Sequence, residues 1–156
     1  MTFIECLKRT PVIPSTFIVS KLAFNEAGGF NETMQASEDW ELWVRLSARR
    51  NIYVDLSRLC LYRLREGSLS TRPELTARMT ATVLRKWVGS PEAGAMSEAE
   101  YRRLCSWHRL WNAYSCAARG RRFPEEAFRG LPVIRGPGLR TGSPSRSPGA
   151  FRGRLA

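Results

Sequence analysis

Two carboxylates, Glu38 and Asp39, open a segment that the sequence predicts to be helical from about residue 38 to 49. At about 100° per residue, Asp39 falls in the apolar arc of that helix. The arc also holds Trp40, Leu42, Trp43 and Leu46. Apolar neighbours disfavour the charged form of a carboxylate, whereas a helix N-terminus favours it. The position is therefore suited to a general base whose pKa is tuned by its surroundings.

A structural interpretation of the same residues stays open. Ser and Asp are preferred at helix N-caps, so Ser37 or Asp39 could serve only to cap the helix. On the opposite side of the helix, Glu41 and Arg45 are four residues apart, and we expect them to form an ordinary surface ion pair.

Four short segments support a more specific hypothesis. They are the run PSTFIVS at 14–20, GGFNE at 28–32, EDWELWVRL at 38–46, and the pair Tyr62-Arg63. In this order they resemble the C-terminal half of a family 2 glycosyltransferase, over roughly 11–70. The resemblance implies an α/β fold with a GT-A-type sheet, of which this chain would hold a part. It also implies transfer of a sugar from a nucleotide-diphosphate sugar to an acceptor hydroxyl, with inversion at the anomeric carbon.

The resemblance also assigns roles to individual residues. Asp39 matches the family's catalytic base, and Glu38 matches its acidic neighbour. Gly28 and Gly29 match a turn whose backbone comes close to the sugar site. By the same resemblance, the pocket is lined or supported by Trp40 and Trp43.

The chain departs from the family pattern where a metal would bind. The family's donor-binding half carries an Asp-x-Asp motif for a divalent cation, Mg or Mn, that bridges the diphosphate. This chain has only two aspartates, Asp39 and Asp55, which are far apart. Arg65 stands where family members often have a histidine; arginine cannot ligate a metal, although its guanidinium could contact a phosphate. We therefore expect no metal bound by this chain alone.

The expected identity is a fragment that lacks the donor-binding half and is inactive by itself. In the complete enzyme, its partners would be a nucleotide-sugar and a hydroxyl acceptor. The family also suggests a cytoplasmic location with peripheral contact to the inner face of the membrane. The alternative is a non-catalytic basic interaction module, or a truncated remnant, that binds a protein, a membrane surface or nucleic acid, of which nucleic acid is the least expected.

The rest of the chain predicts two blocks and a tail. Residues 1–90 would be the glycosyltransferase-like part, with strands over 14–20 and within 51–65 and helices over 21–27, 38–49 and 71–88. Residues 91–130 would be a helical extension, with a helix from a Ser97–Glu100 capping box to about Arg119 and a short one over 124–129. In the long helix, Trp107 and Trp111 are expected on a packed face and Tyr101 toward solvent.

The tail, residues 131–156, is rich in Gly, Pro, Ser and Arg and carries no acid, so it predicts disorder. Its arginines supply a large part of the formal charge of +11. One interpretation is binding to acidic phospholipid headgroups or RNA. The other is a solvated tail without a partner.

The remaining candidate groups suggest no second chemistry. His108 is the only histidine, and we expect no catalytic role for it. The four cysteines lack zinc-ligand spacing and predict free thiols in a reducing compartment. The sequence shows neither a long apolar span nor a signal-peptide pattern.

Overall fold

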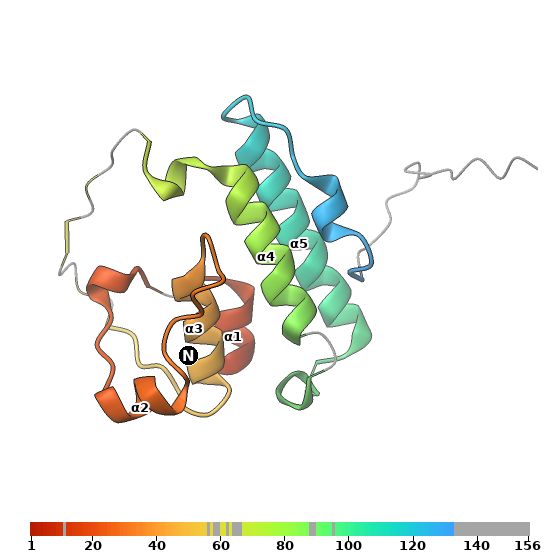
Figure 1. The fold of residues 1–156 in the computed structure, drawn as a ribbon. Helices are drawn as coiled ribbons and strands as arrows, with labels where there is room; N and C mark the ends of the chain where they lie inside the picture. Colours follow the sequence, from red (N-terminus) through yellow and green to blue (C-terminus); the bar gives the residue numbers. More distant parts are fainter. Residues whose placement is uncertain are drawn as a thin grey trace, which may run out of the picture.

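The computed structural model describes residues 1–10, 12–55, 57, 60, 61, 63, 67–87, 90–94 and 96–132. This part of the chain is helical (Figure 1). Its α-helices are α1 (Phe3–Lys8), α2 (Lys21–Glu26), α3 (Glu38–Ser47), α4 (Pro73–Trp87) and α5 (Glu98–Ala117). Its 3₁₀ helices are η1 (Pro14–Thr16), η2 (Leu69–Thr71), η3 (Pro91–Ala93) and η4 (Glu125–Phe128).

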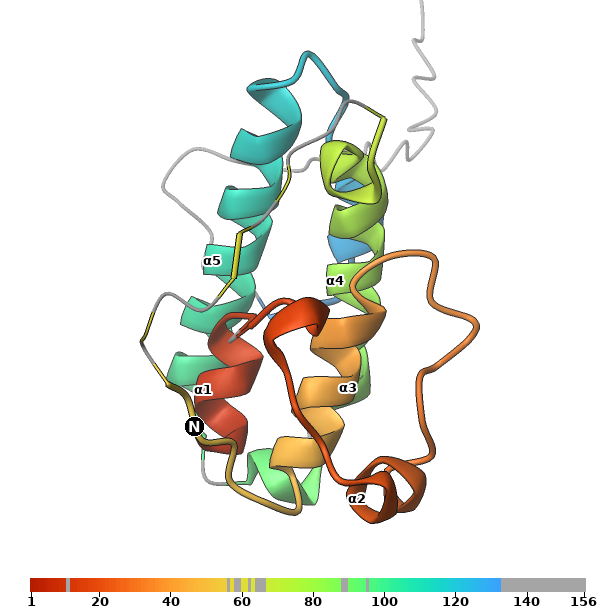
Figure 2. The ribbon, with the colours of Figure 1, turned by 90° about the vertical axis from the view of Figure 1, so that its left-hand side faces the viewer.

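The α-helices form two pairs around one core. Helices α4 and α5 lie antiparallel and side by side, and α1 lies against α3 (Figures 1 and 2). Leu7 of α1, Leu42 and Val44 of α3, and Leu84 of α4 are fully buried where the pairs meet. Burial of a side chain of this size contributes about 1.5–3 kcal/mol, so this shared core holds the two pairs together.

Local sequence explains where the helices begin. The predicted capping box of α5 is confirmed, because Glu100 accepts a hydrogen bond from the Ser97 backbone and its own N–H donates to the Ser97 hydroxyl. Thr2 and Glu5 form the same arrangement at α1, a helix that the sequence patterns did not predict. The helices predicted over 21–27, 38–49, 71–88 and 97–119 are confirmed, with ends that differ by no more than two residues.

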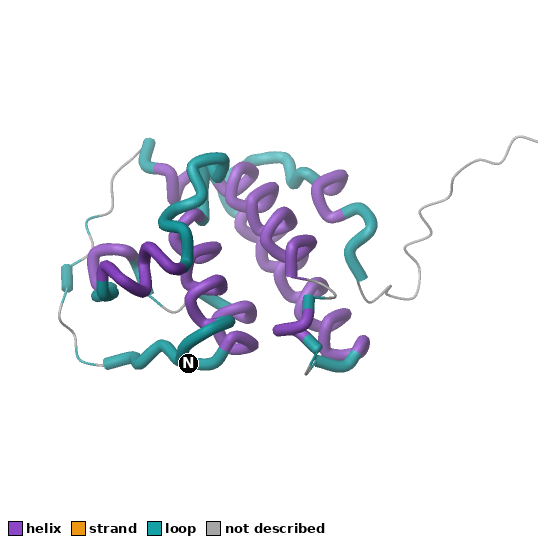
Figure 3. The backbone as a smooth tube through the Cα atoms, turned by 60° about the horizontal axis from the view of Figure 1, so that its bottom comes forward, coloured by secondary structure: helices purple, strands orange, loops and turns teal. Residues whose placement is uncertain are grey.

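The predicted α/β fold with a partial GT-A-type sheet is wrong, since the described residues contain no strand (Figure 3). Residues 14–20 begin as η1 and continue as an extended segment. In that segment Phe17 and Val19 pack against the core, while Ile18 is 98% exposed. The alternation that predicted a strand is therefore real, but a strand also needs a neighbour to pair with, and no described segment pairs with it.

The segment after α3 shows the same behaviour. Ile52 is buried and the next side chain, Tyr53, is 93% exposed, as in a half-buried strand. The Ile52 backbone N–H donates to the Met1 carbonyl at 3.0 Å, and the Met1 amino group donates to the Ile52 carbonyl. One such exchange fixes the segment beside α1 without extending into a ladder. The second strand predicted within 51–65 falls largely on residues outside the described part.

The third predicted block is also mostly outside that part. Of residues 131–156, the structure describes only Leu131 and Pro132. Disorder of the tail, and the division of the chain at residues 90 and 130, therefore stay predictions.

A buried carboxylate joins the two helix pairs, and here a second prediction fails. Glu41 does pair with Arg45, but its side chain is only 2% exposed, so the pair is not a surface one. Glu41 also accepts from the Lys86 ammonium of α4 at 2.7 Å. Arg45 in turn donates to the carbonyls of Ala27 and Gly29. Helix α3 is enclosed on this side by α4 and by the turn after α2, which is why a residue expected in solvent is buried.

We predict that Glu41→Gln lowers the free energy of unfolding by about 2–3 kcal/mol, because it leaves the Arg45 guanidinium partly buried without its carboxylate. The exposure of Lys86 keeps the loss below that of a fully buried pair. Chemical denaturation measures the change. Glu98→Gln is the matched control, since it removes an exposed i,i+4 pair with Arg102 and should cost no more than about 0.5 kcal/mol. Equal losses in the two variants would contradict the prediction.

Candidate functional site

The first turn of α3 holds the predicted base. Ser37 is the N-cap residue and has φ 57°, an uncommon conformation for a residue other than glycine, and its hydroxyl makes no capping bond. Asp39 instead accepts a hydrogen bond at 2.7 Å from the Trp40 N–H. The capping interpretation thus applies to Asp39.

The surroundings of Asp39 raise the pKa of its carboxyl group above the ordinary value. Burial is the largest cause, and the negative charge of Glu38 acts in the same direction. The hydrogen bond from the Trp40 N–H opposes them without cancelling them. Desolvation and a neighbouring charge of the same sign are the usual means of strengthening a carboxylate as a base.

The two tryptophans after Asp39 are anchors. The Trp40 indole N–H donates to the Cys6 carbonyl at 2.7 Å, and that of Trp43 donates to the Val12 carbonyl at 3.2 Å. Phe17 stacks on Trp43 with ring centroids 3.7 Å apart. Both indoles are buried, so they support the start of α3. Trp40 also lines a groove beside α5 that is described below.

The two glycines do not lie beside Asp39. Gly28 and Gly29 have φ 84° and 68° and follow α2, where Arg45 binds the Gly29 carbonyl at 2.6 Å. Arg45 is six residues after Asp39, which is about 9 Å along the helix. Figure 2 shows the chain then running from α2 back along α3 to its N-terminus. The predicted role of Arg65 falls on a residue outside the described part.

His108 has a structural partner that its sequence neighbours could not reveal. Its ring is 8% exposed, lies 5.1 Å from that of Trp40, and its Nε2 is 3.0 Å from the Leu7 carbonyl. Because a carbonyl only accepts, Nε2 carries the proton and Nδ1 keeps a lone pair. Burial lowers the pKa of the imidazole below its ordinary value, and the bond to Leu7 opposes this in part.

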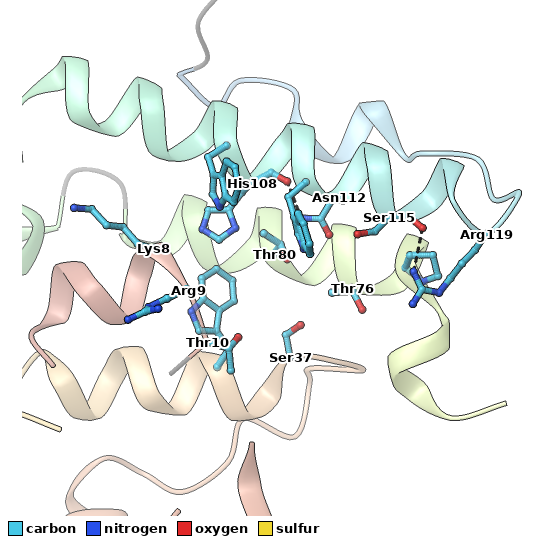
Figure 4. Close-up of a pocket in the computed structure, with 14 residues that line it drawn as sticks. Lys8, Arg9, Thr10, Ser37, Thr76, Thr80, His108, Asn112, Ser115 and Arg119 are labelled. Carbon is cyan, nitrogen blue, oxygen red and sulfur yellow. Dashed lines mark hydrogen bonds between the residues drawn. The ribbon is translucent and has the colours of Figure 1, made fainter. Parts of the chain in front are cut away.

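A groove of about 530 Å³ opens between the two helix pairs (Figure 4). We call it the interhelical groove. Its lining residues are Lys8, Arg9, Thr10, Ser37, Trp40, Pro73, Thr76, Thr80, Trp107, His108, Trp111, Asn112, Ser115 and Arg119. Asp39 is absent from this lining, although Ser37 and Trp40 belong to it. The groove was not predicted, because its residues come from four helices and the segments next to them.

Helix α5 presents a different face from the one expected. Trp107 and Trp111, expected in a packed face, are 58% and 54% exposed. Tyr101, expected in solvent, is buried and donates its hydroxyl to the Trp87 carbonyl at 3.0 Å. Helix α5 packs on α4 in an orientation in which His108 and Asn112 face inward, while Trp107 and Trp111 lie at the groove.

Metal and thiol chemistry find little support in the described residues. None of their His, Cys, Asp and Glu side chains gather in groups of three that could hold a metal ion. These residues do not fit the divalent cation of the resemblance, whose ligands would have to come from elsewhere. The cysteines are free: Cys6, Cys105 and Cys116 are buried, with burial raising the pKa of each thiol, and Cys60 is exposed.

Comparison with known proteins now gives the class. The model of glycosyltransferase-like family 2 matches residues 4–100, which is more than half of the chain, and the chain belongs to this family. No curated protein and no solved structure matches it. The family region contains Asp39 and one side of the interhelical groove, whereas most of α5 lies beyond it. Across the ranges that the structure describes, no helix is long and apolar enough to cross a membrane.

We predict that His108, the only histidine, titrates below its ordinary pKa and remains an Nε2–H tautomer at neutral pH. The fold favours the neutral ring, so its stabilising contribution is present above the unfolded pKa and is lost as pH falls through the folded pKa. Nitrogen-15 NMR of the imidazole measures both the tautomer and the pKa. An Nδ1–H tautomer would contradict the bond to Leu7, and titration at or above about 6.5 would contradict the effect of burial on the imidazole.

Proposed function

We propose that this chain acts in the transfer of a sugar from a nucleotide-diphosphate sugar to an acceptor hydroxyl, with Asp39 as the general base. Membership of glycosyltransferase-like family 2 supports the class of reaction. The observation that carries the assignment is the partly buried Asp39 carboxylate in the first turn of α3, whose pKa is raised by burial and by Glu38. A carboxylate with a raised pKa is the stronger base in its ionised form.

The proposed step involves one proton and two bonds. Asp39 takes the proton of the acceptor hydroxyl while the hydroxyl oxygen forms a bond to the anomeric carbon. The bond from that carbon to the nucleotide diphosphate breaks, and its electron pair leaves with the diphosphate. Attack from the side opposite the leaving group inverts the configuration. In this proposal Glu38 is a positioning residue that acts through the charge it places beside Asp39.

In this proposal the nucleotide-sugar donor is bound by residues other than those that the structure describes. No described cluster of carboxylates fits the cation of a sugar diphosphate. The alternative function is a basic interaction module that binds a partner through its helices or its tail. The tail at 131–156 gives it no support, because the structure describes only two of these residues.

Asp39→Asn should reduce sugar transfer by about 10²–10⁴-fold, the usual contribution of a general base. Nucleotide-sugar binding should stay within about twofold of its original affinity, because Asn keeps the shape and still accepts from the Trp40 N–H. The measurement is transfer from a panel of radiolabelled nucleotide-sugars by the full-length protein in extracts of its source. Equal loss of binding and turnover would contradict a role in proton transfer.

The chain offers a matched control for that experiment. Asp55 is the only other aspartate, and its exposed carboxylate accepts a hydrogen bond from the Ser57 N–H. Asp55→Asn should leave transfer unchanged.

Thermal unfolding should show that Asp39→Asn is as stable as the original protein or more so at neutral pH. A carboxyl whose folded pKa is raised stabilises the fold below the unfolded pKa and loses this contribution as pH rises through the folded one.

Glu38→Gln should move the acid limb of the pH–activity profile to lower pH. The variant removes the negative charge that raises the pKa of Asp39, so the base ionises at lower pH. The measurement is the pH dependence of kcat/KM, which follows the ionisation of the free enzyme. An acid limb that stays in place would show that Glu38 does not act through Asp39.

A further inference from the structure

We propose that the interhelical groove binds an anionic saccharide, a ligand with several hydroxyl groups and at least one carboxylate or phosphate. This site goes beyond the transfer step, because it does not contain Asp39 and is built in large part from α5, outside the family region. Binding to it can be measured without a sugar donor. A negative result there would leave the proposal for Asp39 standing.

The floor of the groove is polar, buried and has unused hydrogen-bonding capacity. Thr80, His108 and Asn112 line it and are only 4%, 8% and 3% exposed. Asn112 uses its amide NH₂ to bind the His108 carbonyl at 2.8 Å, which leaves Oδ1 as an acceptor. His108 uses Nε2 on Leu7, which leaves the Nδ1 lone pair. Figure 4 shows these side chains facing the space between α5 and Ser37.

The free polar atoms of this floor are not sealed from solvent, since the buried side-chain atoms without a partner among the described residues are Glu74 Oε2 and Trp87 Nε1. Thr80 adds a hydroxyl that makes no bond to a described residue, unlike Thr76 and Thr82, which each bond to the carbonyl four residues earlier. His108 Nδ1 and Asn112 Oδ1 are both acceptors, so a ligand that bonds to them must donate. Sugar hydroxyls both donate and accept, whereas a fully ionised oxyanion only accepts.

The aromatic side of the groove suits a ring with C–H groups on its faces. Trp107 and Trp111 are more than half exposed, and their rings are inclined by only 19° with centroids 6.1 Å apart. The face of an indole carries negative charge density and attracts the partially positive C–H groups of a saccharide ring. Two large exposed indoles beside a polar floor are otherwise an unfavourable arrangement in water.

Cationic side chains are the third feature of the groove. Lys8, Arg9 and Arg119 line the groove, and no carboxylate does. None of the three forms an ion pair with a described residue, whereas Lys86, Arg78 and Arg109 each do. An arginine fork fits a carboxylate or phosphate well. The three cations are exposed, so they are accessible to a charged ligand in the groove. The groove volume of about 530 Å³ is in the range of small-ligand sites.

Isothermal titration calorimetry on the full chain tests the proposal with four probes: trigalacturonate, glucose 6-phosphate, maltotriose and sodium phosphate. We expect one or both charged saccharides to bind, and which one binds identifies the anionic group. Maltotriose should bind at least about tenfold more weakly, since charged hydrogen bonds contribute about 1.5–3 kcal/mol. The proposal is overturned if neither charged saccharide binds, if maltotriose binds equally well, or if sodium phosphate binds as tightly as the saccharides.

Two charge variants place the binding in the groove. Lys8→Gln with Arg9→Gln should weaken binding of the charged saccharide by about tenfold or more. Lys21→Gln with Arg103→Gln removes the same charge from exposed positions outside the groove, and it should change affinity by less than about twofold at 0.15 M salt. Equal weakening by both pairs would indicate non-specific attraction and overturn the site.

The tryptophans distinguish a saccharide from a membrane. Trp107→Ala should weaken saccharide binding by about two- to tenfold, the range of an aromatic contact. Tyr53→Ala, which removes an exposed aromatic ring elsewhere, should have no effect. Vesicles of phosphatidylglycerol provide the last arm. Vesicle binding that depends on Trp107, together with no binding of either charged saccharide, would assign the surface to a lipid headgroup layer and overturn the proposal.

Discussion

The structure depends on two ring N–H groups that bind consecutive carbonyls at the end of α1. Trp40 of α3 donates to Cys6, and His108 of α5 donates to Leu7. The last carbonyls of a helix have no partner within it, and α1 has only six residues in which to find others. Side chains from two distant helices satisfy them instead. These bonds fix α1 between α3 and α5, and thereby set the width of the interhelical groove and the position of the first turn of α3.

The helices could be predicted because their signals are local. Ser97 and Glu100, or Ser20 before α2, determine a helix start within four residues. The sheet prediction failed for a reason that is not local. Phe17 to Val19 and Ile52 to Tyr53 alternate between core and solvent as strands do, and period-two alternation specifies only which side chains face inward. A strand also requires a partner, and that depends on the rest of the fold.

The same distinction applies to the site. The partial burial of Asp39 could be predicted from its place among apolar residues at a helix start, and burial does raise its pKa. The burial of Glu41 could not be predicted, because helical periodicity assumes one buried face. Helix α3 is instead covered on several sides, by α1, α4 and the turn after α2. The interhelical groove could not be predicted from the sequence either. Its floor combines Thr80 with His108 and Asn112, and no spacing along the chain relates these positions.

The distribution of the cysteines has a consequence for reactivity. The thiolate is the species that reacts with electrophiles, and burial both blocks access to a thiol and disfavours its ionisation. Cys6, Cys105 and Cys116 are in this situation, and the pKa of Cys105 is raised to about 11. Cys60 is the one exposed thiol of the four. A maleimide fluorophore would therefore attach at a single position of the folded protein, and labelling of the other three would report its unfolding.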